Sequence, residues 1–343
     1  MEPGTSLLVA RDLQTGYHSG GRRKLVSAQL PELSVRAGRL ICLLGPNGSG
    51  KSTLLRTLAG LQPALGGNVL VGDRSGLSPS ELARKIGLVL TDRVGGSNLN
   101  VYSLVALGRY PWSGWLGLLT EADRTIIREA IAAADIGSLL DRKVHTLSDG
   151  ENQKVMLARA IAQDTPILML DEPTAHLDLP SRIRLMRLLH HLARTTNKGI
   201  LLSTHELDLA LQVADEVWLM QTLAPLHRGA PEDLVLDGSF EAAFEKEDVS
   251  FDRATGVFRI HPEGGRRIRL MTTATPLGGL AAFWTRRALQ RQGFAVVEEE
   301  AGDTLVIGEQ AGRPTWGLNT GGNTRIYESI ATLLEALDHL RLL

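Results

Sequence analysis

Residues 45–53 read GPNGSGKST, and the rest of the chain is arranged around this stretch. It follows the apolar run LICLL at residues 40–44 and precedes Leu54, Leu55 and Leu58, which fall on one face at helical spacing. The order predicted here is therefore a buried strand, a tight loop and a helix, with the pattern G-x-x-x-x-G-K-[ST] forming the loop.

The loop contains the residue types that phosphate binding requires. Gly45, Gly48 and Gly50 let the backbone turn sharply and approach a ligand, and the N–H groups of the loop and the following helix form an anion site. Lys51 brings positive charge to the β- and γ-phosphates, and the Ser52 hydroxyl can bind Mg²⁺. A glycine-rich turn with an exposed lysine would not explain so many matching positions. The stretch predicts a nucleoside-triphosphate site made of Gly45, Pro46, Asn47, Gly48, Ser49, Gly50, Lys51, Ser52 and Thr53.

Composition limits the class of protein. At 343 residues the chain can form one large domain and one small one. A net charge of -1 gives no electrostatic reason to expect nucleic acid as a partner. Cys42 is the only cysteine, so no disulfide forms within the chain. No signal pattern is present and no apolar run reaches the ~18 residues that span a bilayer, so we expect any membrane role to be peripheral.

Two further apolar strands end in polar residues. Residues 167–170, ILML, precede Asp171 and Glu172, and residues 200–204 precede His205. The carboxyl ends of strands in an open α/β sheet face the ligand, so these residues and Gly45 should meet at one edge. Asp171 is placed to hold Mg²⁺ through the water shell of the metal, and Glu172 to orient or deprotonate an attacking water. The alternative is a pair of solvent-facing acids beside a surface histidine.

Residues 92–163 have mainly helical spacing and predict an inserted helical subdomain. Within it, the run RYPWSGW places Arg109, Tyr110, Trp112 and Trp115 close together. Such residues anchor interfaces, and they also fill the cores of small helical lobes. The partner surface is the slightly preferred interpretation.

The helix that ends at Gln163 begins with a capping box formed by Ser148 and Glu151. Capping does not explain Gly150 in the first turn, where glycine costs about 1 kcal/mol relative to alanine. A glycine there suggests that something comes close to the backbone. Earlier in the chain, Tyr17 is open to two interpretations, a ring that stacks on a nucleotide base or an aromatic residue on a hairpin.

These motifs together resemble those of the nucleotide-binding subunits of ATP-binding-cassette (ABC) transporters, over residues 5 to about 230. GPNGSGKST resembles the Walker A loop, and ILMLDE at 167–172 resembles the Walker B strand with Glu172 as catalytic glutamate. AHLD at 175–178 resembles the D-loop, which contributes Asp178, and His205 resembles the switch histidine. LSDGE at 147–151 is similar to the signature motif, whose Ser148, Gly150 and Glu151 would face the ATP of the opposite subunit.

The resemblance implies a fold, an activity and partners. The fold is an α/β P-loop NTPase sheet with a helical subdomain and N-terminal antiparallel strands at residues 1–262, followed by a small C-terminal α+β domain at 265–343. The activity is ATP hydrolysis with ATP and Mg²⁺, in a homodimer that powers integral-membrane permease subunits at the cytoplasmic face of the inner membrane and, indirectly, receives substrate from a substrate-binding protein. The run VYSLVALGRYPW is most similar to importers of iron–siderophore, haem and cobalamin type.

A soluble ABC-type ATPase in assembly or nucleic-acid processing is the alternative. The stretch between Lys51 and Ser148 has room for one small helical lobe and for no coiled coil, and with the neutral charge this argues against the DNA-repair branch.

Two sites depart from the family pattern. Asp149 and Glu151 replace a glycine and a glutamine of the usual LSGGQ signature. Thr91 stands where the family has a glutamine that contacts Mg²⁺ and the attacking water, and its hydroxyl is shorter. Beyond residue 265, strands are predicted at residues 268–271, 295–298, 304–307 and 315–318, with two helices and a turn at residues 321–323.

Overall fold

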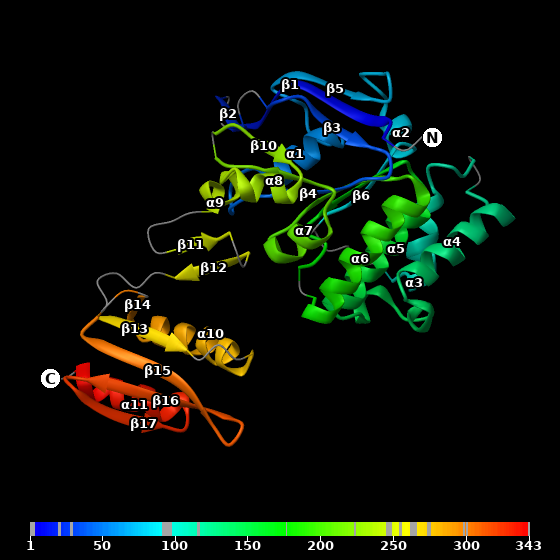
Figure 1. The fold of residues 1–343 in the computed structure, drawn as a ribbon. Helices are drawn as coiled ribbons and strands as arrows, with labels where there is room; N and C mark the ends of the chain where they lie inside the picture. Colours follow the sequence, from blue (N-terminus) through cyan, green and yellow to red (C-terminus); the bar gives the residue numbers. More distant parts are fainter. Residues whose placement is uncertain are drawn as a thin grey trace. The chain divides into compact units, whose positions relative to one another are not determined.

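The computed structural model describes residues 4–19, 22–27, 30–90, 98–114, 117–175, 177–222, 224–244, 249–253, 256–260, 266–272, 276–297, 299 and 301–341. The chain forms two compact units, Met1–Phe244 and Glu245–Leu343 (Figure 1). This boundary precedes the one expected after residue 262. The intervening strands β11 (Val249–Asp252) and β12 (Val257–Ile260) pair only with each other, so they add nothing to the sheets of the first unit.

The main sheet of the first unit has the strand order β10-β9-β4-β8-β7-β6. All neighbouring pairs are parallel except β9 and β10. Strands β4, β7 and β8 are buried along their whole length, which explains why they are continuous apolar runs in the sequence. The strands are β4 (Leu40–Leu44), β6 (Ile86–Val89), β7 (Ile167–Asp171), β8 (Gly199–Ser203), β9 (Glu216–Leu219) and β10 (His227–Gly229).

A second, antiparallel sheet covers this core and confirms the predicted N-terminal strands (Figure 1). In it β1 pairs with β2, β3 and β5. The apolar side of helix α1, Leu54, Leu55 and Leu58, shares one buried cluster with residues from both sheets. The elements are β1 (Ser6–Ser19), β2 (Arg22–Ser27), β3 (Leu33–Arg36), β5 (Gly66–Val71), α1 (Lys51–Leu58), α2 (Pro79–Ala83), α6 (Leu179–Thr196), α7 (Leu207–Val213), α8 (Pro231–Leu236) and α9 (Ser239–Phe244).

The predicted helical subdomain is present in the first unit. Helices α3, α4 and α5 pack on one another through Val105, Ile127 and Ala158, each fully buried. The lobe consists of α3 (Val101–Ala106), η1 (Leu107–Arg109), α4 (Glu121–Ala133), η2 (Gly137–Leu139), η3 (Val144–Thr146) and α5 (Asp149–Ala162).

The second unit has the predicted α+β character. A sheet of order β14-β13-β15-β16-β17 packs one face against two helices. The turn at Gly321 and Gly322 is confirmed, and it leads into β17, a strand that was not among those predicted. The elements are β13 (Arg267–Thr272), α10 (Pro276–Arg291), β14 (Ala295–Val297), β15 (Asp303–Gln310), β16 (Arg313–Thr320), β17 (Asn323–Tyr327) and α11 (Ile330–Arg341).

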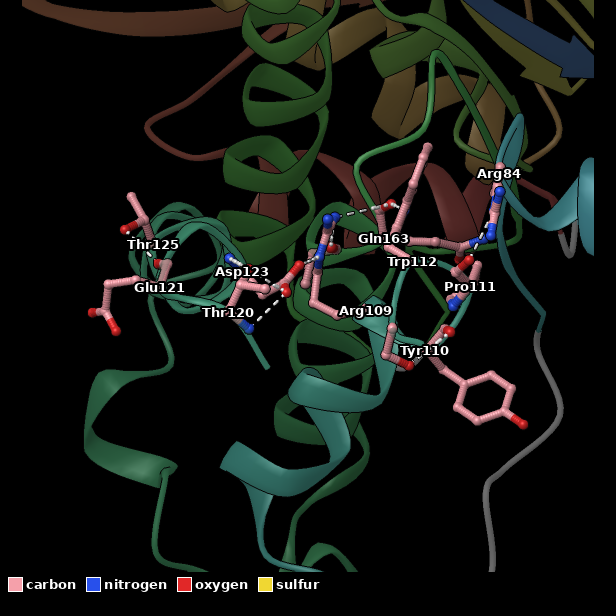
Figure 2. Close-up of polar contacts among 12 residues, drawn as sticks. Arg84, Arg109, Tyr110, Pro111, Trp112, Thr120, Glu121, Asp123, Thr125 and Gln163 are labelled. Atoms are coloured by element: carbon pink, nitrogen blue, oxygen red, sulfur yellow. Dashed lines mark hydrogen bonds and ion pairs between the residues drawn. The ribbon is translucent and has the colours of Figure 1, made fainter. Parts of the chain in front are cut away.

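The aromatic run of the lobe turns out to be partly structural (Figure 2). Arg109 is 7% exposed; its Nε donates to Asp123 Oδ1 at 2.8 Å and its Nη1 to the carbonyl oxygen of Ala162 at 3.1 Å. Trp112 Nε1 donates to the carbonyl oxygen of Gln163 at 2.6 Å. The preferred interpretation as a partner surface is therefore wrong for Arg109. The same residue types serve interfaces and lobe cores, so composition alone could not separate the two.

Other members of this run differ. Tyr110 is 75% exposed and points away from the Arg109 cluster (Figure 2). The guanidinium groups of Arg84 and Arg109 lie 5.6 and 5.5 Å from the centroid of the Trp112 ring, which is itself partly exposed. Trp115 lies outside the described residues.

The ion pair between Arg109 and Asp123 should make the lobe sensitive to acid. Hydrogen bonds from Thr120 and then from Arg109 hold the pKa of Asp123 at about 2. Because this pKa is lower than that of an unfolded aspartate, the carboxylate stabilises the folded state above about pH 4, and this stabilisation is lost as the pH falls towards 2. Asp123→Asn should lower the free energy of unfolding by about 2 kcal/mol at pH 7, measured by urea denaturation.

Glu121→Gln, at an exposed position of the same helix, is the matched control and should change stability by less than about 1 kcal/mol. The difference between Asp123→Asn and the unmodified chain should shrink between pH 4 and pH 3. An equal loss in both variants would contradict the structural role of this pair.

Candidate functional site

The glycine-rich loop between β4 and α1 is held in a conformation that other residues do not fit. Gly45 has φ 154° and Gly50 has φ 101°. A Cβ atom on Gly45 would lie 2.1 Å from the carbonyl oxygen of Met220, and one on Gly50 would lie 2.1 Å from Cγ1 of Val26. The packing of this loop therefore requires glycine at both ends, as the close approach of a phosphate would.

Lys51 follows the loop and is almost fully buried at the start of α1. Its Nζ donates to the carbonyl oxygens of Gly45 at 2.9 Å and Pro46 at 3.1 Å. An ammonium group has three donors, so one remains for a ligand. Burial lowers the pKa of Lys51, while the charges of Glu172 and Asp171 oppose this shift. The cation is thus fixed beside the loop and faces two carboxylates.

Asp171 joins three segments at the carboxyl end of β7. Its Oδ1 accepts hydrogen bonds from Ser52 Oγ at 3.0 Å and from Ser203 Oγ at 2.7 Å. The two residues predicted to bind magnesium, Ser52 and Asp171, are therefore adjacent. Magnesium takes oxygen ligands and relies on few protein groups beside substrate phosphates and water. This oxygen pair fits such an ion, and the described residues hold no cluster of three or more His, Cys, Asp or Glu.

Glu172 and His205 also meet, as predicted. His205 Nε2 lies 2.8 Å from Glu172 Oε1. The backbone of Glu172 has φ 50°, a left-handed conformation that is unfavourable for this residue type. Its N–H donates to Ser203 Oγ at 3.0 Å and to the carbonyl oxygen of Ser203 at 3.2 Å, which hold it in place. Such stored strain is typical of functional positions.

A cleft of about 510 Å³ lies over the loop. This volume is within the range of nucleotide-sized ligand sites. Glu172 lines it, and His205 reaches it through Glu172. Tyr17 lines the same cleft and is exposed, which favours the base-stacking interpretation. The lining residues are Tyr17, Leu25, Val26, Asn47, Gly48, Gly50, Lys51, Ser52, Thr53, Glu172 and Thr222.

The segment LSDGE does not line this cleft. Ser148 is the N-cap of α5, and Glu151 closes the predicted capping box by accepting the Ser148 N–H at 2.8 Å. Glu151 also accepts from Arg142 Nη1 at 2.7 Å, and these contacts lower its pKa. The extra carboxylate is thus turned into the cap. A Cβ atom on Gly150 would lie 3.3 Å from Cδ2 of Leu177, a neighbour within the same chain.

Three further residues, Asp178, Thr91 and Ser203, concern the helix cap after the acidic pair and the support of the acids. Asp178 caps α6 by accepting the N–H of Ser181 at 3.0 Å, and hydrogen bonds from the side chain of Ser181 and then from this N–H lower the pKa of Asp178. Thr91 lies outside the described residues. Ser203, which supports both Asp171 and Glu172, was not assigned a role. Its only sequence signal is a hydroxyl group at the end of the strand that leads to His205.

Comparison with known protein families gives two matches on this chain. The family "ABC transporter" matches residues 29–175, and the family "Iron ABC transporter C-terminal domain" matches residues 278–338. The first covers the glycine-rich loop and the Asp171–Glu172 pair, and the second lies within the second unit.

Individual relatives match over most of their length. The chain is 38% identical to a cobalt import ATP-binding protein of Rhodobacter capsulatus, over 82% of this chain and 100% of the relative. It is 35% identical to a hemin import ATP-binding protein of Streptomyces coelicolor, over 76% and 91%. Among solved structures, an inward-facing transporter assigned to the metal-chelate ABC type has a TM-score of 0.59 and 25% identity, over 70% of this chain and 88% of that one.

Ser203 should be important for the order of the site. Ser203→Ala removes one of two donors to Asp171 and one of two acceptors of the Glu172 N–H, and each lost hydrogen bond costs about 0.5–1.5 kcal/mol. We expect a lower free energy of unfolding of this size in urea denaturation. Ser138→Ala, at an exposed position in η2, is the control and should have little effect. Equal stability of both variants would show that Ser203 does not hold the two acids.

Proposed function

Because the chain belongs to the ABC transporter ATP-binding family, we propose that it binds MgATP in this cleft and that its hydrolysis of ATP drives a membrane permease. One observation carries this proposal. Asp171 and the Glu172–His205 pair lie beside the loop at residues 45–53, which contains Lys51.

Each residue then has a role. The N–H groups of the loop and Lys51 hold the β- and γ-phosphates. Ser52 and Asp171 would hold Mg²⁺, which neutralises phosphate charge when bound. Glu172 accepts a proton from the attacking water, and His205, hydrogen-bonded to that carboxylate, orients it toward the γ-phosphate. Tyr17 stacks on the base.

Substitution separates binding from hydrolysis. Glu172→Gln should retain ATP binding and lower the hydrolysis rate by on the order of 10²–10⁴, which is the usual contribution of a positioned base. Lys51→Ala should weaken ATP binding itself, because the cation beside the loop is lost. Phosphate release measures the first effect and fluorescent-nucleotide titration the second. A wild-type hydrolysis rate in Glu172→Gln would refute the assignment of Glu172.

The proposal includes a homodimer that closes on two ATP molecules. Ser148, Gly150 and Glu151 begin α5 and do not line the cleft of their own chain. The first N–H groups of a helix suit an anion. In the dimer they would face the γ-phosphate bound to the opposite copy, with Asp178 and Leu177 beside them.

The permease would dock on a groove of about 450 Å³ between α5 of the helical lobe and the α1, α2 and β6 region. The groove is largely apolar, and burial lowers the pKa of Arg159 within it. Among the described residues, no ion-pair partner of Arg159 is present. Arg159 is half-buried, and a cation withdrawn from water is costly unless it is paired, so the docking element should have an apolar face and a carboxylate. The lining residues are Ala59, Gly60, Leu61, Pro79, Leu82, Ala83, Ile86, Leu88, Leu90, Met156, Arg159 and Gln163.

Arg159→Leu tests this docking site. It should weaken co-purification with the permease by about tenfold or more, as loss of a charged interface pair does, and leave ATP binding unchanged. Arg128→Ala, exposed on α4, is the control and should co-purify normally. Retention of the permease by Arg159→Leu at the wild-type level would exclude this groove as the contact.

The transported substrate is proposed to be an iron chelate. The match of residues 278–338 to an iron transporter domain and the hemin import relative support it. A relative that imports cobalt and one that imports cobalamin make a cobalt compound the second candidate. No described helix is long and apolar enough to cross a membrane, and we propose that the chain is held peripherally at the cytoplasmic face by the permease. The substrate-binding protein that stimulates hydrolysis in the assembled transporter would identify the chelate.

A further inference from the structure

The sheet of the second unit has one face that its helices do not cover. Leu305, Ile307, Trp316 and Leu318 point into the core with α10 and α11. Side chains alternate along a strand, so the residues between them point to the opposite face. In Figure 1 both helices lie behind this sheet, consistent with that assignment. Met271, Val306 and Ile326 on the open face are 43%, 42% and 71% exposed.

The strand register aligns these exposed residues. Met271 pairs with Val306, Val306 with Gly317, and Gly317 with Ile326. They form one row across β13, β15, β16 and β17, which we name the apolar row. Gly317 has no side chain, so the row has a notch between two branched side chains. A Cβ atom there would lie 3.7 Å from the carbonyl oxygen of Val306, an ordinary van der Waals distance, so the notch is a shallow gap in the row.

The surroundings of the apolar row contain little charge. The adjacent row runs Val297, Arg269, Thr304, Asn319 and Thr324, and Gly308 pairs with Thr315 on the other side. Arg269 is the one charged residue in these rows. At the start of the same strand, Arg267 is engaged by Glu299 at 3.4 Å. Solvent-exposed surfaces are usually a quarter or more charged, whereas the centres of protein interfaces are depleted of charge.

Shape and charge together indicate which molecule covers this face. Two copies related by a two-fold axis near Gly317 would place Val306 of each copy over the notch of the other, which makes the face self-complementary. Its sheet geometry suits face-to-face packing of two sheets. Among the described residues the Nε of Arg269 has no hydrogen-bond partner although it is buried, so the one charge beside the apolar row lies partly below the surface. A strongly charged partner molecule could pair with only one charged side chain in these rows, Arg269.

We propose that the open sheet face of the second unit is a dimer interface between two copies of this chain. The contact does not require nucleotide, so it is separate from the ATP-dependent pairing proposed for the first unit. It would keep two chains together while their nucleotide sites open.

Sedimentation velocity of the full chain without nucleotide, in EDTA, tests this interface. A dimer is expected at micromolar concentrations. The double variant Val306→Asp with Ile326→Asp should weaken self-association by about 30-fold or more, which corresponds to loss of a central interface contact. Both positions are exposed, so folding is retained, and thermal unfolding checks this.

Two controls make the result specific. Leu280→Asp, 58% exposed on α10 and thus away from the open sheet face, should stay dimeric. Lys51→Ala should also stay dimeric without nucleotide, so failure of the ATP-binding proposal would leave this result unchanged. A monomeric unmodified chain at 100 μM, a dimer that persists in the double variant, or a dimer lost in Leu280→Asp would each overturn the proposal.

A cross-link gives a second measurement. Cys42, the only native cysteine, is fully buried, and burial raises the pKa of its thiol. In Val306→Cys the introduced thiol is therefore the reactive one, and a bismaleimide that spans about 10 Å, the spacing of two facing sheets, should link two copies into a dimer. Leu280→Cys should not form this dimer. Equal cross-linking at both positions would indicate random collision and contradict the interface.

Discussion

The site of the first unit depends on the two hydrogen bonds that the Asp171 carboxylate accepts. This carboxylate joins the end of β7 to the start of α1 through Ser52 and to the end of β8 through Ser203. Ser203 in turn holds the backbone of Glu172 in its left-handed conformation. Three segments far apart in the sequence are fixed at one sheet edge in this way, so the loop, the proposed metal ligands Ser52 and Asp171, and the proposed base Glu172 are positioned together. Preorganisation of this kind is what phosphoryl transfer requires of a protein.

The helical lobe is tied to the same centre by packing and by ion pairs. Gly150 leaves space for Leu177, in the loop that follows Glu172, so the start of α5 and that loop are in contact. At the other side of the lobe, Arg109 connects η1 to α4 through Asp123 and to the end of α5 through Ala162. A movement of the lobe would therefore shift the loop that follows Glu172. This contact is a physical route between the groove proposed for the permease and the cleft proposed for ATP.

The second unit adds a different kind of surface. One face of its sheet packs against α10 and α11. The opposite face, with Val306, Gly317 and Ile326, is open and almost uncharged. The residues proposed for ATP hydrolysis all lie in the first unit. A lasting contact between copies would raise the effective concentration of one cassette for the other, which is useful if the nucleotide-dependent contact opens in each cycle.

The sequence by itself determined the nucleotide site and the class of fold. The loop at residues 45–53, the acids after β7 and the histidine after β8 are local patterns, and parallel strands bring their carboxyl ends together. Tertiary structure alone decided that Ser203 supports both acids, that Arg109 is buried, and that Glu151 turns into its helix cap. It also decided which face of the second sheet stays open. These features depend on pairing between residues distant in the chain, and strand order and register, which set that pairing, are not encoded in any single stretch.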